Sequence, residues 1–245
     1  MRQVLLDQLD ELGLKHMRRA LERQLETTGS GERSFEERLL DLVECERVER
    51  DDRRLKERIR KAGLSQAGRL EELDHATARG LERSTLEFLG RDAWVKDHRN
   101  VAVTGATGVG KTFLACALAH RACGHGFNAR YFRLPRLLAE MQMARADGTY
   151  FGRLASLARI DVLVLDDWGL APLEPAARRD LLEILDDRYQ KRSTVIVAQL
   201  PVENWHEWIA DPALADAILD RVVHNAYPIH IKGESQRKTR GLAAK

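Results

Sequence analysis

The eight residues GATGVGKT at positions 105–112 constrain the fold of this 245-residue chain more than any other feature. They follow the apolar run NVAVT and precede the helical run FLACALAHRA, so they predict a tight loop between a buried strand and a helix. Gly105, Gly108 and Gly110 let the backbone amides and the helix N-terminus face an anion. This is the pattern of a Walker A phosphate-binding loop. The alternative, a glycine-rich turn with a chance Lys and Thr, does not account for the flanking strand and helix.

The loop predicts ATP and Mg²⁺ as ligands. Lys111 is expected to reach the terminal phosphates of ATP and to act in catalysis, and the Thr112 hydroxyl is expected to bind Mg²⁺, which accepts few protein ligands. We expect the nucleotide to contact the whole loop and the residue after it: Gly105, Ala106, Thr107, Gly108, Val109, Gly110, Lys111, Thr112 and Phe113.

A second motif, IDVLVLDDWG, ends an apolar run in two acids, as a Walker B motif does at the carboxyl edge of a parallel sheet. Asp166 is the expected magnesium ligand. Asp167 is the candidate general base, although its side chain is shorter than the Glu that is common at this position. An acidic turn after a core strand is the alternative reading. The spacing from the loop leaves room for a strand and a helix, which favours the class of ATPase in which another strand separates the two motifs.

Two further residues are candidates for the reaction. Gln199 follows the apolar run TVIVA and could orient the attacking water, or it could equally be an ordinary loop residue. Arg221 lies in the predicted helix ALADAILDRVVHNA, and from a neighbouring subunit it could stabilise charge on the transferred phosphoryl group as an arginine finger. The alternative for Arg221 is an exposed side chain that pairs with Asp216 or Asp220.

The fold class follows from a change of pattern along the chain. Up to about residue 90 the apolar residues fall at helical spacing, with a capping box formed by Ser34 and Glu37 and a helix end at Gly63. From Asn100 onwards, strands alternate with amphipathic helices, which predicts an α/β domain with a parallel sheet. Expected strands are 101–104, 129–133, 161–165, 194–198 and 227–231. Pro228 puts the last strand at the sheet edge, or delays its start. We therefore divide the chain into a helical domain, 1–75, and an ATPase domain, 76–245, with a basic tail.

Composition indicates a soluble, charge-rich protein, with 44% hydrophobic and 32% charged residues. A net charge of +2 is too small to argue for nucleic acid by itself. The three cysteines, Cys45, Cys116 and Cys123, show no CxxC pair, so a reducing cytoplasm is the expected location and the last two are expected to be apolar fillers. No stretch approaches the roughly 18 apolar residues of a membrane span, so no membrane partner is expected.

Taken together, these motifs resemble the IstB-like ATP-binding proteins, helper ATPases of bacterial insertion sequences related to DnaC-type helicase loaders and DnaA within the AAA+ superfamily. The resemblance extends over nearly the whole chain, including LVLDDWGLAPL, RRDLLEILDDRYQKRSTVIVAQL and KGESQRK. It implies ATP-dependent homo-oligomers that bind duplex DNA and assist a partner transposase. It also implies a sensor role for Gln199 and favours the finger role of Arg221. The chain departs from the family at Ala198, where a small hydroxyl residue is common, and at Trp168, where Leu or Phe is usual.

The run RRLKERIRK offers independent but limited support for DNA binding. On a predicted helix its basic side chains could follow a phosphate backbone, or they could form a solvated face paired with the acidic ECERVERDD before it. The candidates are Arg53, Arg54, Lys56, Arg58, Arg60 and Lys61. A second basic group comprises Lys232, Arg237, Lys238 and Arg240, of which Arg237 could instead sense nucleotide. We expect Trp205 and Trp208 to be packing residues rather than base-stacking ones.

Two other functions compete with that of a transposition helper. A P-loop kinase would need an acceptor pocket and a basic lid, whereas the chain after Asp167 runs directly into a predicted helix. A helicase loader that acts as a protein-binding adaptor is compatible with the same motifs. Retention by a replicative helicase, without stimulation of transposition, would favour the loader.

Overall fold

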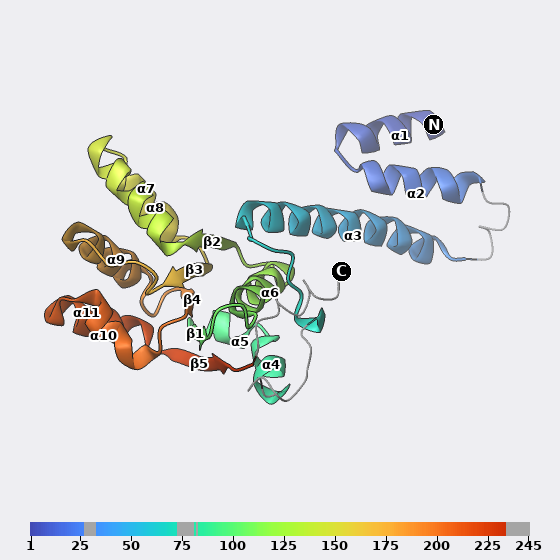
Figure 1. The fold of residues 1–245 in the computed structure, drawn as a ribbon. Helices are drawn as coiled ribbons and strands as arrows, with labels where there is room; N and C mark the ends of the chain where they lie inside the picture. Colours follow the sequence, from blue (N-terminus) through green and yellow to red (C-terminus); the bar gives the residue numbers. More distant parts are fainter. Residues whose placement is uncertain (27–32, 73–80, 82, 234–245) are drawn as a thin grey trace, which may run out of the picture. The chain divides into compact units, whose positions relative to one another are not determined.

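The computed structural model describes residues 1–26, 33–72, 81 and 83–233, and the chain divides into two compact units, Met1–Glu57 and Arg58–Lys245 (Figure 1). The division falls inside helix α3 (Phe35–Ala62), whereas the sequence analysis placed it at residue 75. The cause is local: the Arg58 guanidinium donates to the Cys123 carbonyl at 2.9 Å, so the last turn of α3 packs with the second unit.

The first unit contains α1 (Arg2–Glu11), α2 (Lys15–Glu26) and the larger part of α3. The predicted capping box opens α3: the Ser34 amide donates to the Glu37 carboxylate at 2.9 Å, and the Glu37 amide donates to Ser34 Oγ at 3.2 Å. Gly63, with φ +60°, follows the last residue of α3. Both predicted ends of this long helix are therefore confirmed.

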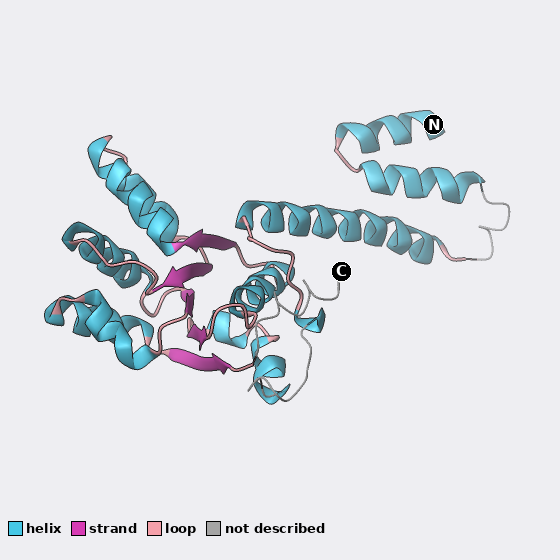
Figure 2. Cartoon of the chain, in the orientation of Figure 1, coloured by secondary structure: helices cyan, strands magenta, loops and turns pink. Residues whose placement is uncertain are grey.

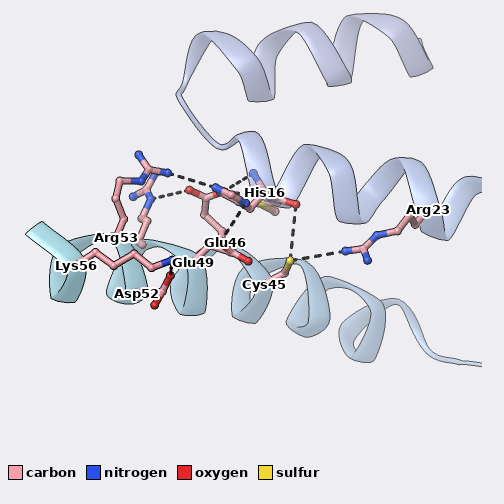
Figure 3. Close-up of polar contacts among 10 residues, drawn as sticks. His16, Arg23, Cys45, Glu46, Glu49, Asp52, Arg53 and Lys56 are labelled. Atoms are coloured by element: carbon pink, nitrogen blue, oxygen red, sulfur yellow. Dashed lines mark hydrogen bonds and ion pairs between the residues drawn. The ribbon is translucent and has the colours of Figure 1, made fainter. Parts of the chain in front are cut away.

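A buried carboxylate on α3 holds the start of α2 (Figure 3). Glu46 is 5% exposed and accepts hydrogen bonds from the His16 amide at 2.9 Å and the Met17 amide at 3.1 Å. Arg50 Nε donates to its other oxygen at 2.7 Å. Burial alone would raise the pKa of Glu46, but the hydrogen bonds from Arg50 and the two amides outweigh it and hold the pKa below its ordinary value of 4.5.

We expect Glu46→Gln to destabilise the first unit by about 1–3 kcal/mol, because an acceptor of charge-assisted hydrogen bonds is lost from a buried position. Since folding lowers the pKa of Glu46, its contribution should be complete above pH 4.5 and disappear as the pH falls through the lower folded value. Hydrogen exchange of the His16 and Met17 amides at neutral and acidic pH measures this directly. The control is Glu49→Gln on the same helix, where the carboxylate is half exposed and 3.8 Å from His16 Nδ1.

The second unit alternates strands with helices (Figure 2). Its strands are β1 (Asn100–Gly105), β2 (Ala129–Arg133), β3 (Val162–Trp168), β4 (Ser193–Ala198) and β5 (Ala226–Ile231). Its helices are η2 (Leu70–Glu72), α4 (Arg83–Leu89), α5 (Ala93–Lys96), α6 (Lys111–Gly124), α7 (Leu134–Ala146), α8 (Tyr150–Ala158), α9 (Pro175–Arg188), η4 (Val202–Asn204), α10 (Trp205–Ile209) and α11 (Pro212–Val222).

The five strands form one parallel sheet in the order β2-β3-β4-β1-β5. All five expected strands are present, and β5 lies at an edge, as Pro228 predicts, because a residue without an amide proton cannot complete a central ladder. β4 separates the strand of the phosphate-binding motif from the strand of the acidic motif, as their spacing predicts. The carboxyl ends of β1, β3 and β4 therefore meet at one edge, where the candidate residues lie.

Helices cover both faces of the sheet. In Figure 1, α7 to α11 lie on one side of the strands and α6 lies on the other. Alternate residues of the central strands, among them Leu163, Leu165 and Ile196, join the core beneath α7 to α11. Within the part of the chain that the structure describes, no helix combines the length and apolarity needed to cross a membrane.

Candidate nucleotide-binding site

The loop from Gly105 to Gly110 requires glycine at defined positions. Gly105 has φ +143°, and a Cβ there would lie 2.2 Å from the Ile231 carbonyl oxygen of β5, so no side chain fits without moving the strand. Gly110 has φ +104° and directly precedes α6. These conformations place the N-terminus of a 14-residue helix at the end of the loop, where its free amides favour an anion.

The first turn of α6 carries the two side chains expected to bind the phosphates and Mg²⁺ of a nucleotide, Lys111 and Thr112. Lys111 is 7% exposed, and its ammonium donates to the carbonyls of Gly105 at 2.8 Å and Ala106 at 2.7 Å. Thr112 Oγ1 donates to Asp166 Oδ2 at 2.9 Å. The loop and the acidic motif, which are 54 residues apart in sequence, thus meet through a hydroxyl and a carboxylate. These are hard oxygen donors of the kind Mg²⁺ takes, so the residues present fit the ion.

The Asp166 carboxylate is fixed from several sides. Its Oδ2 also accepts from the Tyr131 hydroxyl at 2.7 Å, and its Oδ1 accepts from the Asp167 amide at 2.8 Å. Asp166 is 5% exposed. Burial raises the pKa of Tyr131, and its hydrogen bond to Asp166 raises it further, so the phenol remains protonated and acts as a donor to the carboxylate.

Asp167 lies at an irregularity in the sheet. The register between β3 and β4 shifts between Leu165 and Trp168, and Asp167 adopts φ +61°, a left-handed conformation that is uncommon for a residue with a side chain. Arg133 Nε, at the end of β2, donates to Asp167 Oδ2 at 2.5 Å. Backbone strain of this kind is concentrated at functional sites, and here it falls on the candidate general base.

Gln199 lies beside the phosphate-binding loop. It directly follows β4, and its Oε1 accepts a hydrogen bond from Thr107 Oγ1 at 2.8 Å. The structure therefore brings Gln199 together with the loop. Whether it orients water remains a prediction.

Arg221 lies at the opposite end of the strands from the loop, near the start of β1. Its carbonyl accepts from Asn100 Nδ2 at 3.0 Å, and Asn100 is the first residue of β1, whereas the loop follows the last. A strand of this length separates them by about 16 Å. Arg221 Nε donates to Asp186 Oδ1 at 2.5 Å, so its carboxylate partner is on α9 and is neither Asp216 nor Asp220. Within one chain, Arg221 is not part of the site.

Two of the six basic candidates on α3, Arg54 and Lys56, pair with acids of their own helix. Lys56 contacts Asp52 at 2.6 Å, and Arg53 donates to the His16 ring at 3.3 Å (Figure 3). Arg54 contacts Asp51 at 3.6 Å. Arg58 is half-buried against α6. Arg60 and Lys61 are exposed at the end of the helix. The acid pairing expected of a solvated face is therefore present, although exposed pairs of this kind are weak, about 0–1 kcal/mol, and can be exchanged for phosphates.

The remaining candidates are a tryptophan cluster and the basic tail. Trp205 is fully buried, and the Trp168 ring packs against both Trp205 and Trp208, at centroid distances of 5.2 and 5.1 Å, so the predicted packing role is confirmed. Cys116 and Cys123 are buried in α6, also as predicted. Lys232 is exposed just after β5. Arg237, Lys238 and Arg240 lie outside the described residues.

Two residues near the site, Tyr131 and Arg133, were missed by the sequence analysis. Both lie on β2, which pairs in parallel with β3 so that Arg133 is in register with Asp166. The signal was available: the predicted strand ARYFR carries polar residues at its carboxyl end, and parallel neighbouring strands end at the same edge. Their partners could not be identified without knowing that β2 lies beside β3.

A sequence model of the family described as IstB-like ATP binding protein matches residues 7–244. The chain belongs to this family. Among similar proteins, the insertion-sequence ATP-binding protein y4pL of Sinorhizobium fredii is 46% identical over 234 residues, covering 95% of each chain. The ATP-binding protein of insertion sequence IS1162 from Pseudomonas fluorescens is 48% identical over 203 residues, covering 82% of this chain and 87% of the relative. The chain is thus an IstB-like, insertion-sequence ATP-binding protein.

Solved structures share the fold of this IstB-like chain. DnaI aligns over 72% of this chain and 94% of its own, with a TM-score of 0.59 and 21% identity. DnaA from Aquifex aeolicus, bound to AMPPCP, aligns over 74% of this chain and 55% of its own, with a TM-score of 0.57 and 15% identity. At these identities the likeness concerns the fold alone, a parallel sheet with helices on both faces. The fold class expected from the sequence is therefore confirmed.

Proposed function

We propose that this IstB-like protein is a Mg²⁺-dependent ATPase that assembles on duplex DNA and prepares target DNA for a partner transposase. The observation that carries the ATPase part is the convergence of Lys111, Thr112 and Asp166 at one sheet edge. The transposition part is supported by family membership and by relatives named as ATP-binding proteins of insertion sequences.

Hydrolysis would divide its tasks among residues of different strands. Lys111 and the loop amides bind the phosphates, and Thr112 and Asp166 are the ligands offered to magnesium, which would neutralise charge on the phosphates. Asp167, after leaving Arg133, accepts the proton of the attacking water, and Gln199 beside Thr107 orients that water. Arg221, the candidate for stabilising the transferred group, lies at the other end of β1, about one strand length from the loop, and so would not reach the nucleotide of its own subunit.

Arg221 would act on the nucleotide of a neighbouring subunit. Its guanidinium is about one quarter exposed and is held by Asp186 and by the Ala217 carbonyl, so it sits pre-positioned on the surface of the unit. A site completed by a second copy couples the γ-phosphate to subunit packing, because ATP would stabilise the assembled state over the separated one. We infer a head-to-tail oligomer, in which the surface of one subunit that carries Arg221 meets the nucleotide site of the next.

DNA would meet the exposed basic side chains of α3. Arg54 and Lys56 have side chains that are 69% and 76% exposed, and their contacts to acids are of the i,i+3 and i,i+4 type within the helix. Replacement of these contacts by phosphate contacts releases counterions from DNA, which makes the affinity depend on salt.

We expect the double variant Arg54→Glu, Lys56→Glu to bind duplex DNA more weakly and to lower the slope of log affinity against log salt by about 2 units, one for each lost phosphate contact. Fluorescence anisotropy with ATP at several salt concentrations measures both. Arg47→Glu, an exposed arginine on the same helix outside the basic run, is the matched control. An unchanged slope would assign the run to a solvated helix face. Arg58 is excluded from the test because its loss would disturb the packing against Cys123.

A helicase loader is the second candidate function, and the observation that favours it is the shared fold with DnaI and with the DnaC helicase loader. The two functions differ in partner. A pulldown with a replicative helicase, run beside a transposition assay, separates them: helicase retention without stimulation of transposition supports the loader, and the reverse supports the transposition helper.

A further inference from the structure

One hydrogen bond to Asp166, the carboxylate proposed to bind magnesium, has no part in the chemistry proposed above. Asp166 Oδ2 accepts from two hydroxyls, those of Thr112 at 2.9 Å and Tyr131 at 2.7 Å. Thr112 belongs to the phosphate-binding motif, whereas Tyr131 comes from the middle of β2. A carboxylate oxygen shared by two donors from different elements cannot rotate without breaking one of the bonds. Tyr131 therefore restricts the orientation of Asp166.

The Tyr131 hydroxyl also interacts with the segment that follows α3. The Ser65 side chain hydrogen bonds to the Tyr131 hydroxyl, and Ser65 Oγ lies 3.5 Å from Cys116 Sγ on α6. Because the Tyr131 proton is donated to Asp166, the Tyr131 oxygen is free to accept from Ser65. Ser65, Tyr131 and Asp166 thus form a directed chain of hydrogen bonds.

The same segment packs along the helix that begins with Lys111. A Cβ on Gly68 would lie 2.8 Å from the Phe113 carbonyl oxygen and 3.2 Å from the Ala117 amide, so the backbone of the segment approaches α6 as closely as a glycine allows. Near the far end of α6, Arg58 of α3 donates to the Cys123 carbonyl. The last turn of α3 and the segment after it therefore contact α6 near both its beginning and its end.

We propose that Tyr131 is a positioning residue for Asp166 and that, through Ser65, it couples segment 63–68, which directly follows α3, to the occupancy of the magnesium site. The inference rests on the proposed Mg²⁺-dependent binding of ATP. A change in the position of the Asp166 carboxylate changes the Tyr131 hydrogen bond, and this in turn changes the one from Ser65. Since segment 63–68 directly follows α3, these hydrogen bonds connect the segment after the last turn of α3 to the nucleotide site.

The test uses the full-length protein and two readouts that do not depend on hydrolysis. The first is the gain in affinity for a fluorescent ATP analogue when Mg²⁺ replaces EDTA. The second is hydrogen exchange of the amides in residues 63–68, with and without Mg²⁺ and the analogue. For the wild type we expect a Mg²⁺-dependent gain and slower exchange in this segment.

Three variants separate the two parts of the proposal. Tyr131→Phe should reduce the Mg²⁺-dependent gain about tenfold, since a hydrogen bond to a charged group is lost, and should abolish the protection of residues 63–68, while binding in EDTA stays unchanged. Ser65→Ala should keep the gain and lose the protection. Tyr150→Phe removes another tyrosine hydroxyl that donates to a carboxylate, that of Asp180 at 3.1 Å, and should change neither readout.

The outcomes distinguish this inference from the proposed function. If the wild type shows no Mg²⁺-dependent gain, the proposed magnesium site is wrong and the positioning role is wrong with it. If the wild type shows the gain and Tyr131→Phe retains all of it, only the positioning role is overturned. If Tyr131→Phe loses the gain but exchange in residues 63–68 never responds to nucleotide, the coupling is overturned. Unchanged binding in EDTA shows that the Tyr131→Phe protein is folded.

Discussion

Lys111→Ala is expected to lower the affinity for Mg²⁺-ATP by a factor of about 100 or more, equivalent to about 3 kcal/mol. The ammonium is nearly buried, and it lies within 2.8 Å of the carbonyls of Gly105 and Ala106 at the mouth of the loop. A charge in such a partly dehydrated position interacts with phosphates more strongly than one in water. Isothermal titration calorimetry with a non-hydrolysable analogue measures the change without interference from turnover.

The matched control for this variant is Lys96→Ala, which removes an exposed lysine paired with Asp92 on the short helix α5. It should bind nucleotide as the wild type does. Thermal unfolding of both variants without nucleotide shows whether the fold is retained. A Lys111→Ala protein that is folded and binds ATP with unchanged affinity would contradict the assignment of the loop.

Asp167→Asn should bind Mg²⁺-ATP within about threefold of the wild type but hydrolyse it about 10² to 10³ times more slowly, since general-base catalysis contributes an effect of this size. The amide retains the shape of the side chain and one oxygen that can face Arg133, but it cannot accept a proton from water. The measurement is single-turnover hydrolysis of prebound ATP, which isolates the chemical step from binding and product release.

Asp161→Asn provides the comparison. Asp161 directly precedes β3, at the other end of the strand that carries Asp167, and it accepts from the Asn128 amide at 2.9 Å and pairs with Arg192. Its loss should not slow the chemical step. Undiminished hydrolysis by Asp167→Asn would mean that another group takes the proton.

The α/β domain was largely predictable because its signals are local. Short apolar runs give buried strands, glycines mark the loop, and Pro228 marks an edge, so all five strands were expected within a few residues of their observed bounds. β3 runs to Trp168, three residues beyond its expected end. No sequence pattern predicted the register shift between β3 and β4 or the left-handed backbone conformation of Asp167, which accompany the extension of β3 beyond the two acids.

The contacts that were not predictable join residues far apart in sequence. Glu46 holds the start of α2 from 30 residues away, and Tyr131 on β2 donates to Asp166 on the neighbouring strand β3, 35 residues away. Neither contact leaves a periodic pattern, since each depends on which elements become neighbours. The two compact units likewise divide within α3 rather than at residue 75, because Arg58, near the end of α3, donates to the Cys123 carbonyl of α6.

The central claim is that the nucleotide site is completed by a second subunit, and mixing two inactive variants tests it most directly. Arg221→Ala keeps Asp167 but lacks the arginine, and Asp167→Asn supplies the arginine but lacks the base. Combined in equal amounts on duplex DNA, they should hydrolyse ATP faster than either alone, since about a quarter of the head-to-tail contacts would contain both groups. A mixture no more active than the average of the two separate variants would contradict the shared site.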